Sequence, residues 1–242
     1  MSILSRALNI IDAISKSDQG LRFSEIAALL GHPSPATVNK ILKELLKEGV
    51  LEKTASGRYA LGRKIYFWGR VMAEKNTPIQ VIRAQMKQLH LELKASVNLF
   101  TCIDQNMFCL ENFVDPESPS LWQAGSSLHI HIAILGAIFF IPSTKLHDHT
   151  FLQREINSHP YSLSLDQVER MIELTELTGI QDDLGIFYPG MYRFAIPIRE
   201  KGQTVMTLGL GIMPVRLSNN GLYEKIIAAL RKSKQEIEEH LI

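Results

Sequence analysis

The sequence predicts an α+β protein with two parts, a helical N-terminal part that ends in a β-hairpin and a larger C-terminal part built on an antiparallel sheet. Within residues 1–62, apolar residues recur at helical spacing in three segments, and a Gly-containing loop then separates two short strand-like runs. From residue 78 onward, strand-like runs and amphipathic helical segments are mixed, which is typical of a sheet flanked by helices. We therefore expect a first domain at 1–62, a linker helix at 63–77 and a second domain at 78–242.

The composition indicates a globular protein with a core of its own. Hydrophobic residues make up 45% of the 242 residues and charged residues 21%, as in ordinary folded domains. The longest apolar run, 130–142, contains His131 and is too short to span a bilayer. The N-terminus alternates apolar and polar residues and carries Asp12, and the chain has only two cysteines. We therefore expect a cytoplasmic protein without a signal peptide, a membrane span or a disulfide framework.

Charge is distributed unevenly along the chain. The formal net charge is +1, but residues 1–75 hold twelve Lys or Arg against seven Asp or Glu, a net charge of +5, which leaves −4 for the remainder. The basic segment 1–75 suggests contact with a polyanion, while the acidic remainder suggests a different function. Many cytosolic proteins have uneven halves, so charge alone does not identify a nucleic-acid-binding protein.

Three helices are expected in the first part. Ser2 can cap the first helix. Apolar residues at helical spacing within 23–30 mark a short second helix, which Gly31 ends. A turn follows, with Ser34 as the cap and Pro35 as the first residue of a third helix that runs to about residue 48.

The third helix has two unlike faces. One face is an apolar stripe that includes Val38, Ile41 and Leu45. The other carries small, polar and basic residues, which are Ala36, Lys40, Lys43 and Lys47 with Thr37 and Asn39 on the flanks. Small residues permit close approach to a DNA major groove, an Asn amide can pair with a base edge, and lysines neutralise phosphates. An ordinary solvated helix face is the alternative interpretation.

A hairpin directly after this helix favours nucleic-acid binding. The strand-like runs 50–54 and 58–61 are separated by a loop containing Gly57, with Lys53 and Arg58 near the tip. Three helices followed by a basic hairpin are typical of a winged helix-turn-helix domain, in which the helix contacts bases and the wing lies along the backbone or minor groove. A winged helix used only for protein contacts is the alternative. The predicted DNA contacts are Ser34, Ala36, Thr37, Asn39, Lys40, Lys43, Lys47, Lys53 and Arg58.

Four segments of the first part carry a resemblance to a known family, namely 5–10, 21–27, 37–42 and 59–62. They resemble the corresponding segments of the IclR family of bacterial transcriptional regulators. The resemblance covers essentially the whole chain and is strongest in its first third. This chain departs from the family pattern in the turn before the third helix, where it has one extra residue and carries Ala36 in place of the usual serine. Lys40 replaces an arginine, which removes the forked geometry of a guanidinium.

The predicted linker helix carries a heavy aromatic load. Tyr66, Phe67 and Trp68 are adjacent, so they cannot all face one side of a helix, and some must meet another chain or the second domain. A helix buried within one chain is the alternative. The resemblance implies that this helix joins the domains and helps the DNA-binding heads to dimerise. Because one head contacts one half-site, we expect a homodimer or homotetramer on a double-stranded operator.

The second part is expected to contain both helices and strands. Helices are predicted near 79–94, 131–140, 144–157, 165–178 and 220–241. Strands are predicted near 95–103, 107–113, 121–122, 179–183, 192–199 and 204–213, with a polar turn at 125–128. The resemblance implies that they form a GAF-like or profilin-like effector-binding domain.

The resemblance also implies that a small organic or aromatic acid binds in this second part and changes how two heads address DNA. The residues to which it points are Gly125, Ser126, Ser127, Leu128, Asp183, Arg193, Leu210 and Ile212. Gly125 permits close backbone approach, and the serines with nearby free amides can donate hydrogen bonds to a carboxylate. Arg193 stands where the family often has a cysteine, and a guanidinium can hold a carboxylate by two parallel hydrogen bonds. Alternatively, Arg193 pairs with Asp182 or Asp183 and closes an empty pocket.

Other chemistries find little support in the sequence. His129 and His131 would share one face of a strand, but no further ligand has suitable spacing for a metal site. Asp182 and Asp183 would point to opposite sides of a strand, so they cannot act as a carboxylate pair. The sequence contains no nucleophile elbow, P-loop or dinucleotide glycine pattern. We therefore expect no enzyme activity, no metal and no cofactor.

The two cysteines allow one further interpretation. If the chain turns at 104–106, Cys102 and Cys109 could lie opposite each other on adjacent strands, as a redox switch requires. Apolar neighbours would raise the pKa of both thiols and leave them inert. We expect two small buried hydrophobic residues.

Together these observations predict a DNA-binding transcriptional regulator whose C-terminal domain senses a small, carboxylic acid effector and mediates oligomerisation. The alternative is a ligand-independent winged-helix protein whose C-terminal domain acts only in dimerisation. Neither function requires contact with a membrane.

Overall fold

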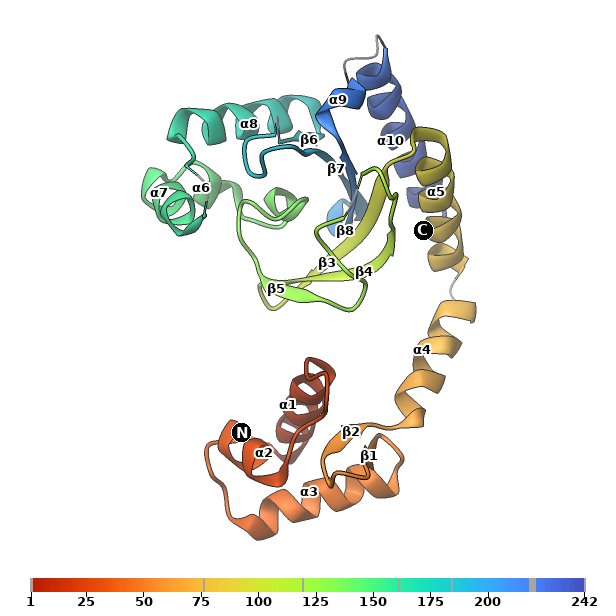
Figure 1. Cartoon of the computed structure of the whole chain (residues 1–242), viewed down its shortest axis with the longest axis vertical. Coiled ribbons are helices and arrows are strands. Elements are labelled where there is room, and N and C mark those ends of the chain that lie inside the picture. Colours follow the sequence, from red (N-terminus) through yellow and green to blue (C-terminus); the bar gives the residue numbers. More distant parts are fainter. Residues whose placement is uncertain are drawn as a thin grey trace. The chain divides into compact units, whose positions relative to one another are not determined.

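The structure is a computed structural model that describes residues 2–75, 77–118, 120–160, 162–183, 185–217 and 221–241. The chain divides into two compact units, Met1–Asn76 and Thr77–Ile242. Figure 1 shows the elements of each unit in sequence colours. Helices combine with antiparallel strands in both units, which confirms the predicted α+β class.

The first unit has three helices, a small sheet and a fourth helix. The elements are α1 (Ile3–Ser15), α2 (Phe23–Leu29), α3 (Pro35–Lys47), β1 (Leu51–Lys53), β2 (Tyr59–Leu61) and α4 (Arg63–Lys75). The antiparallel strands β1 and β2, with the loop between them, form the wing. An isolated bridge pairs Leu21 with Tyr59, so the segment before α2 joins the edge of the wing. This order of elements agrees with the predicted winged helix-turn-helix domain.

Side-chain caps explain where α1 and α3 begin. Ser2 Oγ accepts a hydrogen bond from the Ser5 amide at 3.1 Å, and Ser34 Oγ accepts one from the Thr37 amide at 3.3 Å. Both serines are N-caps, as predicted, and each satisfies an N–H group that has no partner inside its helix. Pro35 begins α3, where a missing N–H leaves no hydrogen bond unmade.

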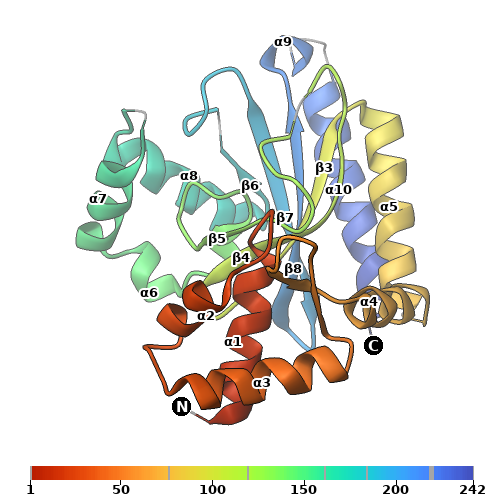
Figure 2. The same cartoon turned by 60° about the horizontal axis from the view of Figure 1, so that its bottom comes forward.

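The first unit has its own hydrophobic core. Ile10 of α1, Ile26 of α2, and Val38 and Leu42 of α3 are almost completely buried against one another. Figure 2 shows these three helices, with α3 in orange at the front of the view. Because the buried side chains of α3 are three or four residues apart, they occupy one face and leave the opposite face to solvent.

The second unit is built on a six-stranded antiparallel sheet with the strand order β5-β4-β3-β8-β7-β6. Its strands are β3 (Ser96–Ile103), β4 (Asn106–Phe113), β5 (Ser127–His129), β6 (Gln181–Asp182), β7 (Tyr192–Glu200) and β8 (Gln203–Ile212). Its helices are α5 (Thr77–Leu93), the 3₁₀ turn η1 (Ala137–Phe139), α6 (Ser143–Leu146), α7 (His149–Ser158), α8 (Leu165–Thr178), α9 (Pro214–Leu217) and α10 (Leu222–Glu238). The sheet thus places β5 at one edge and β6 at the other.

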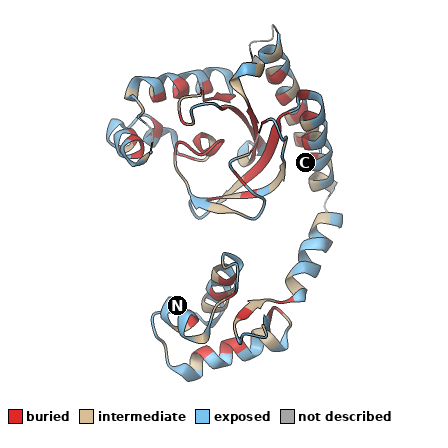
Figure 3. Cartoon of the chain, in the orientation of Figure 1, coloured by how far each residue is buried: buried red, intermediate tan, exposed pale blue. Residues whose placement is uncertain are grey.

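The two faces of this sheet are covered by different layers. Helices α5 and α10 lie side by side over one face and share a core with Phe194, Leu208 and Leu210 of the sheet (Figure 1). The other face belongs to a second core that contains Phe100, Phe187 and buried residues of α7 and α8. Figure 3 shows buried residues along the sheet and along the inner sides of these helices. Since side chains alternate along a strand, neighbouring residues of β7 and β8 point into different cores.

The apolar segment 131–140 differs from the sequence prediction of a helix. It is irregular except for η1, and Gly136 at the start of η1 has a φ of +82°. A Cβ at Gly136 would lie 2.3 Å from Thr207 Oγ1, so the chain passes very close to β8. A left-handed residue in close contact with the sheet interrupts a right-handed helix, and this explains the wrong prediction.

Two smaller predictions for the second unit were also wrong. Residues 127–129 form β5, although 127 and 128 were expected to belong to a turn, whereas 121–122 form no strand. The helix expected at 144–157 is divided into α6 and α7. Asp148 lies between them and caps α7, because its carboxylate accepts a hydrogen bond from the Thr150 amide at 2.9 Å.

Helix α4 contributes no buried residue to the first unit. The exposed fractions are 72% for Tyr66, 62% for Phe67 and 48% for Trp68, and Figure 3 shows the helix largely in the exposed colour. These aromatic residues are therefore not part of the core of a single unit, which was the alternative raised by the sequence. Like every other helix in the described part of the chain, α4 is not long and apolar enough to cross a membrane.

Candidate functional site

Helix α3 presents a cationic surface. Its residues Val38 and Leu42 are buried, whereas Lys40, Lys43 and Lys47 are exposed. In the described part of the chain no carboxylate forms an ion pair with any of these three lysines. Their charges therefore stay available to an external anion.

The N-terminal end of α3 offers short side chains. Ala36 and Asn39 are exposed, and Thr37 is half-buried. The hydroxyl groups of Ser34 and Thr37 share a hydrogen bond of 2.8 Å, so the Ser34 side chain is engaged in capping the helix. Ala36, Asn39 and Lys40 form the open part of this end, where a side chain can approach a base edge.

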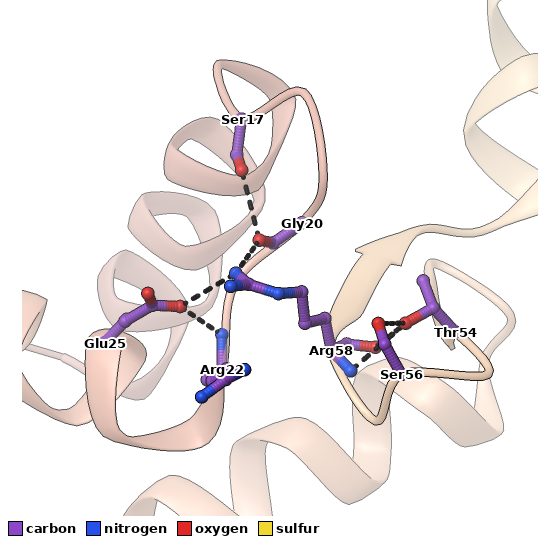
Figure 4. Close-up of polar contacts among 7 residues, drawn as sticks. All are labelled: Ser17, Gly20, Arg22, Glu25, Thr54, Ser56 and Arg58. Carbon is purple, nitrogen blue, oxygen red and sulfur yellow. Dashed lines mark hydrogen bonds and ion pairs between the residues drawn. The ribbon is translucent and has the colours of Figure 1, made fainter.

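The wing holds its two predicted cations in different ways. Lys53 is exposed, with its ammonium group 5.5 Å from the centroid of the Tyr59 ring. Arg58 turns toward the helices, where its Nη1 donates to the Gly20 carbonyl at 3.0 Å and to Glu25 Oε2 at 3.3 Å (Figure 4). Its side chain is only 22% exposed. Arg58 thus connects the wing to the α1–α2 loop, which corrects the expectation of a free cation at the wing tip.

Glu25, the partner of Arg58, was missed by the sequence analysis. Its Oε2 also accepts a hydrogen bond from the Arg22 amide at 2.5 Å, so one carboxylate caps α2 and binds the wing (Figure 4). The capping pattern, an acidic residue three positions after the N-cap, was visible in the sequence. The pairing with a residue 33 positions away was not, because it depends on how the wing folds back.

Arg193, predicted to bind a carboxylate, lies in a buried ion pair. Arg193 is 2% exposed and Asp183 is fully buried. Arg193 Nε donates to Asp183 Oδ2 at 2.5 Å, and the Arg193 amide donates to Asp183 Oδ1 at 2.9 Å. Nη2 donates to the Ala133 carbonyl at 3.1 Å, and the guanidinium lies 4.5 Å from the centroid of the Tyr188 ring. Of the two possibilities that the sequence left open, the structure has the one in which Arg193 pairs with an aspartate.

The segment 125–128 lies across the sheet from Arg193. It leads into β5 at one edge of the sheet, whereas β7 is separated from β5 by β4, β3 and β8. We had expected free amides here, but the amides of Gly125 and Ser126 donate to main-chain carbonyl groups at 2.8 and 3.1 Å. They are therefore not free to bind a carboxylate. Ser127 is half-buried in β5, and Leu128 is 58% exposed. Within the described residues, no hydrogen bond or ion pair joins this segment to Arg193.

Leu210 and Ile212 do not share a face of the sheet with Arg193. Both are completely buried in the core formed with α5 and α10. Arg193 is directly opposite Gly211 in the register of β7 and β8. Because side chains alternate, the β8 residues on the Arg193 face are Gly211 and its odd-numbered neighbours, and the two predicted pocket residues point the other way.

Among the described residues, the histidines and cysteines show no arrangement for metal or redox chemistry. Within the described residues, no group of three or more His, Cys, Asp or Glu side chains is placed to hold a metal ion. Cys102 is opposite Met107 and Cys109 is opposite Phe100, so the two free thiols do not face each other. Burial raises the pKa of both thiols, to about 11 for Cys109. Cys109 agrees with the expectation of a small buried side chain, whereas Cys102 is only half-buried.

The first unit matches a known domain. Residues 3–55 match the sequence model of the IclR helix-turn-helix domain, a range that contains α1, α2, α3 and β1. These residues form a helix-turn-helix domain of the IclR type. The cationic surface of α3 therefore lies within the segment that matches the IclR helix-turn-helix domain.

Solved structures of IclR proteins share the fold over nearly the whole chain. An IclR regulator from Alicyclobacillus acidocaldarius has 17% identity and a TM-score of 0.77, covering 99% of this chain and 98% of that chain. An IclR family regulator from Brucella abortus has 20% identity and a TM-score of 0.71, covering 100% and 93%. An IclR homolog from Microbacterium hydrocarbonoxydans, complexed with 4-hydroxybenzoate, has 19% identity and a TM-score of 0.72, covering 99% of both chains. No curated protein matches this chain.

The IclR helix-turn-helix of this chain has its own features at the turn before α3. Gly31 has a φ of +76° and His32 a φ of +54°, so two successive residues are left-handed in this turn. Ala36 and Lys40, at which the resemblance pointed to a serine and an arginine, both face solvent. The turn and both replacements therefore lie on the surface that would determine base contacts.

Proposed function

We propose that this IclR regulator contacts a double-stranded operator through the open face of α3 and the wing. The observation that carries the proposal is that this face exposes lysines without ion-pair partners among the described residues. The lysines would neutralise phosphates, while Asn39 and the small residues would approach base edges. The proposed contacts are Ser34, Ala36, Thr37, Asn39, Lys40, Lys43, Lys47 and Lys53. The regulator acts in the cytoplasm, where its DNA lies.

One α3 can serve one half-site only. The rise from Ala36 to Lys47 is about 16 Å at ~1.5 Å per residue. Specific binding therefore needs at least two copies, on half-sites about one helical turn (~34 Å) or a multiple of it apart. We infer a homodimer or homotetramer, in which the exposed aromatic residues of α4 contribute to the contact between copies.

We further propose that the second unit senses a small carboxylic acid. The full-length fold similarity to a homolog that is complexed with 4-hydroxybenzoate supports this proposal. An acid bound in the second unit would favour one relative placement of two heads and thereby change DNA affinity. The second candidate is a ligand-independent regulator whose second unit only joins copies. The buried pair of Asp183 and Arg193 favours this candidate, because it occupies the site to which the family resemblance points.

The DNA contacts can be tested by measuring binding to the DNA that flanks the protein's own gene across a series of salt concentrations. If Lys40 and Lys43 bind phosphates, Lys40→Ala and Lys43→Ala should each flatten the slope of log Kobs against log salt by about 1. Lys87→Ala is a matched control, because Lys87 is exposed on α5 of the second unit. Unchanged slopes in both α3 variants would move the interface away from this helix, and binding without salt dependence would overturn the proposed function.

A further inference from the structure

The second unit contains a cavity that the sequence analysis did not identify. It has a volume of about 390 Å³ and lies between the end of the β3–β4 hairpin with β5 on one side and α6 with α7 on the other. Ile130, Phe140 and Phe151 contribute apolar surface to it, and Lys145 and Arg154 contribute cationic groups. A cavity of this size that combines aromatic and aliphatic surface with charged groups has properties of a small-molecule site.

Two cations flank one aromatic ring in this cavity. The ammonium group of Lys145 lies 5.8 Å from the centroid of the Phe151 ring, and Cζ of Arg154 lies 5.4 Å from it. In the described part of the chain Lys145 has no carboxylate partner, and the contact of Arg154 with Glu155 is long, at 4.0 Å. Neither cation is therefore neutralised by a close ion pair, in contrast to Arg193.

The carboxylate of Glu155 also lines the cavity, and its Oε1 lies 4.0 Å from Arg154 Nη2, whereas its other oxygen is engaged elsewhere. Its side chain is 11% exposed, and Oε2 accepts a hydrogen bond from the Ile132 amide at 3.0 Å. The same oxygen lies 3.7 Å from His131 Nε2. Glu155 thus fixes the segment 131–140 against α7. Two cations, Lys145 and Arg154, against this one carboxylate leave the cavity with an excess of positive charge.

We propose that this cavity is the acid-binding site of the chain and that it takes small aromatic monocarboxylates. The carboxylate would meet Lys145 and Arg154, and the ring would lie against Ile130, Phe140 and Phe151. This proposal rests on the proposed function, that the second unit senses a small acid. It moves the site away from Arg193, whose Nε and Nη2 groups already donate to Asp183 and Ala133.

Cys102 offers a direct report on the occupancy of this cavity. It is half-buried and lines the cavity, whereas Cys109 is 1% exposed in the adjacent core. Burial raises the pKa of both thiols, so alkylation by iodoacetamide is best measured near pH 9. In the folded full-length protein, Cys102 should react and Cys109 should not. A ligand in the cavity should slow the reaction at Cys102 several-fold.

The experiment is calorimetric titration of the full-length protein with benzoate, phenylacetate and 3-phenylpropionate, each paired with its uncharged amide. At least one acid should bind, and its amide should bind about tenfold more weakly or not at all, because charge-assisted hydrogen bonds are lost. The double substitution Lys145→Gln with Arg154→Gln should raise the Kd of that acid by about tenfold or more. Both side chains are exposed, so the variant should fold, as circular dichroism can verify. Lys87→Gln, on α5, should leave the Kd unchanged.

Each unfavourable outcome has a distinct meaning. Acid binding that persists in the double variant and leaves the alkylation of Cys102 unchanged would overturn the assignment of this cavity but leave acid sensing intact. Absence of binding by all three acids would overturn both the cavity proposal and the sensing of aromatic acids. The salt series with operator DNA, measured on the same preparation, shows independently whether the protein acts as a DNA-binding regulator.

Discussion

The cations of α3 and the arginine of β7 show how the same charge serves different purposes in the two units. Lys40 and Lys43 are exposed, and no carboxylate of the described residues pairs with them. Arg193 is 2% exposed and shares its charge with the completely buried Asp183. A cation is open to an external anion only where the fold supplies no carboxylate of its own.

The two environments differ for a physical reason. α3 lies at the surface of a small unit, so one of its faces must remain in water. β7 lies next to the edge strand β6 with both faces covered, and a charged residue there must leave water. An unpaired buried charge is very unfavourable, so Arg193 is tolerated only together with its partner. The ion pair of Asp183 and Arg193 therefore has a structural role, whether or not a ligand binds near it.

The largest expected effect comes from breaking this pair. Asp183→Asn keeps the shape of the side chain but leaves the Arg193 charge buried and uncompensated, and should lower the free energy of unfolding of the second unit by about 3–5 kcal/mol. Unfolding in urea can be followed by the fluorescence of Trp122, which packs edge-on against Phe100, in a background with Trp68→Phe. Asp18→Asn, at an exposed loop position of the first unit, should change the transition little.

The comparison between the two units would fail if Asp183→Asn were as stable as the parent protein. Arg193 would then not depend on Asp183, and its guanidinium could turn to an external carboxylate, as the family resemblance suggested. Replacing both residues by apolar ones, Asp183→Leu with Arg193→Met, should be less harmful than Asp183→Asn, because no charge is left unpaired.

Much of the first unit could be predicted because its signals are local. The caps Ser2 and Ser34, Pro35 at the start of α3 and the apolar stripe of α3 each act within a few residues of chain. The exposure of Lys40 follows from the same stripe, because a helix that buries one face must expose the other. Both the fold of this unit and the open part of its site were therefore accessible to sequence reasoning.

The candidate ligand site of the second unit could not be predicted in the same way. The conformation of 131–140 depends on the contact between Gly136 and Thr207, which are 71 positions apart in the numbering. The face of the sheet to which Leu210 points depends on the register of β7 and β8, and a shift of one residue reverses it. The cavity at Lys145 and Arg154 needs α6, α7 and β5 to be placed first.

A smaller effect is expected at Gly136, which holds the irregular segment against the sheet. This segment supplies the Ala133 carbonyl that accepts a hydrogen bond from Arg193. Gly136→Ala combines a strained φ of +82° with a Cβ 2.3 Å from Thr207 Oγ1, and should destabilise the second unit by about 2–3 kcal/mol in the same urea experiment.

Gly190→Ala is the matched control for the contact, because Gly190 has a similar φ of +88° but no heavy atom within 4 Å of an added Cβ. It should destabilise by only about 1 kcal/mol, the cost of the left-handed conformation alone. Equal effects of the two substitutions would mean that the segment can move away from Thr207. The segment 131–140, which covers Arg193, would then be more mobile than the structure indicates.

The smallest expected effect concerns the wing. Here one hairpin contains both a cation without a carboxylate partner and a cation that is paired with a carboxylate. Lys53 is exposed without a carboxylate partner among the described residues, whereas Arg58 binds Glu25 and the Gly20 carbonyl. Lys53→Ala should therefore flatten the salt slope of DNA binding by about 1, as a lost phosphate contact does, while Arg58→Ala should leave the slope nearly unchanged. Arg58→Ala should instead loosen the wing by about 1 kcal/mol, because two partly exposed polar contacts are lost.

Hydrogen exchange can measure this loosening directly. The Tyr59 amide donates to the Leu21 carbonyl at 2.7 Å, and its protection should fall when Arg58 no longer holds the wing against the helices. Glu25→Gln should reproduce this loss of protection, since it removes the charge that Arg58 binds. If Arg58→Ala flattens the salt slope as Lys53→Ala does and Glu25→Gln has no effect, Arg58 leaves Glu25 for a phosphate when DNA binds. Glu25 would then compete with DNA for Arg58 but would not prevent Arg58 from binding a phosphate.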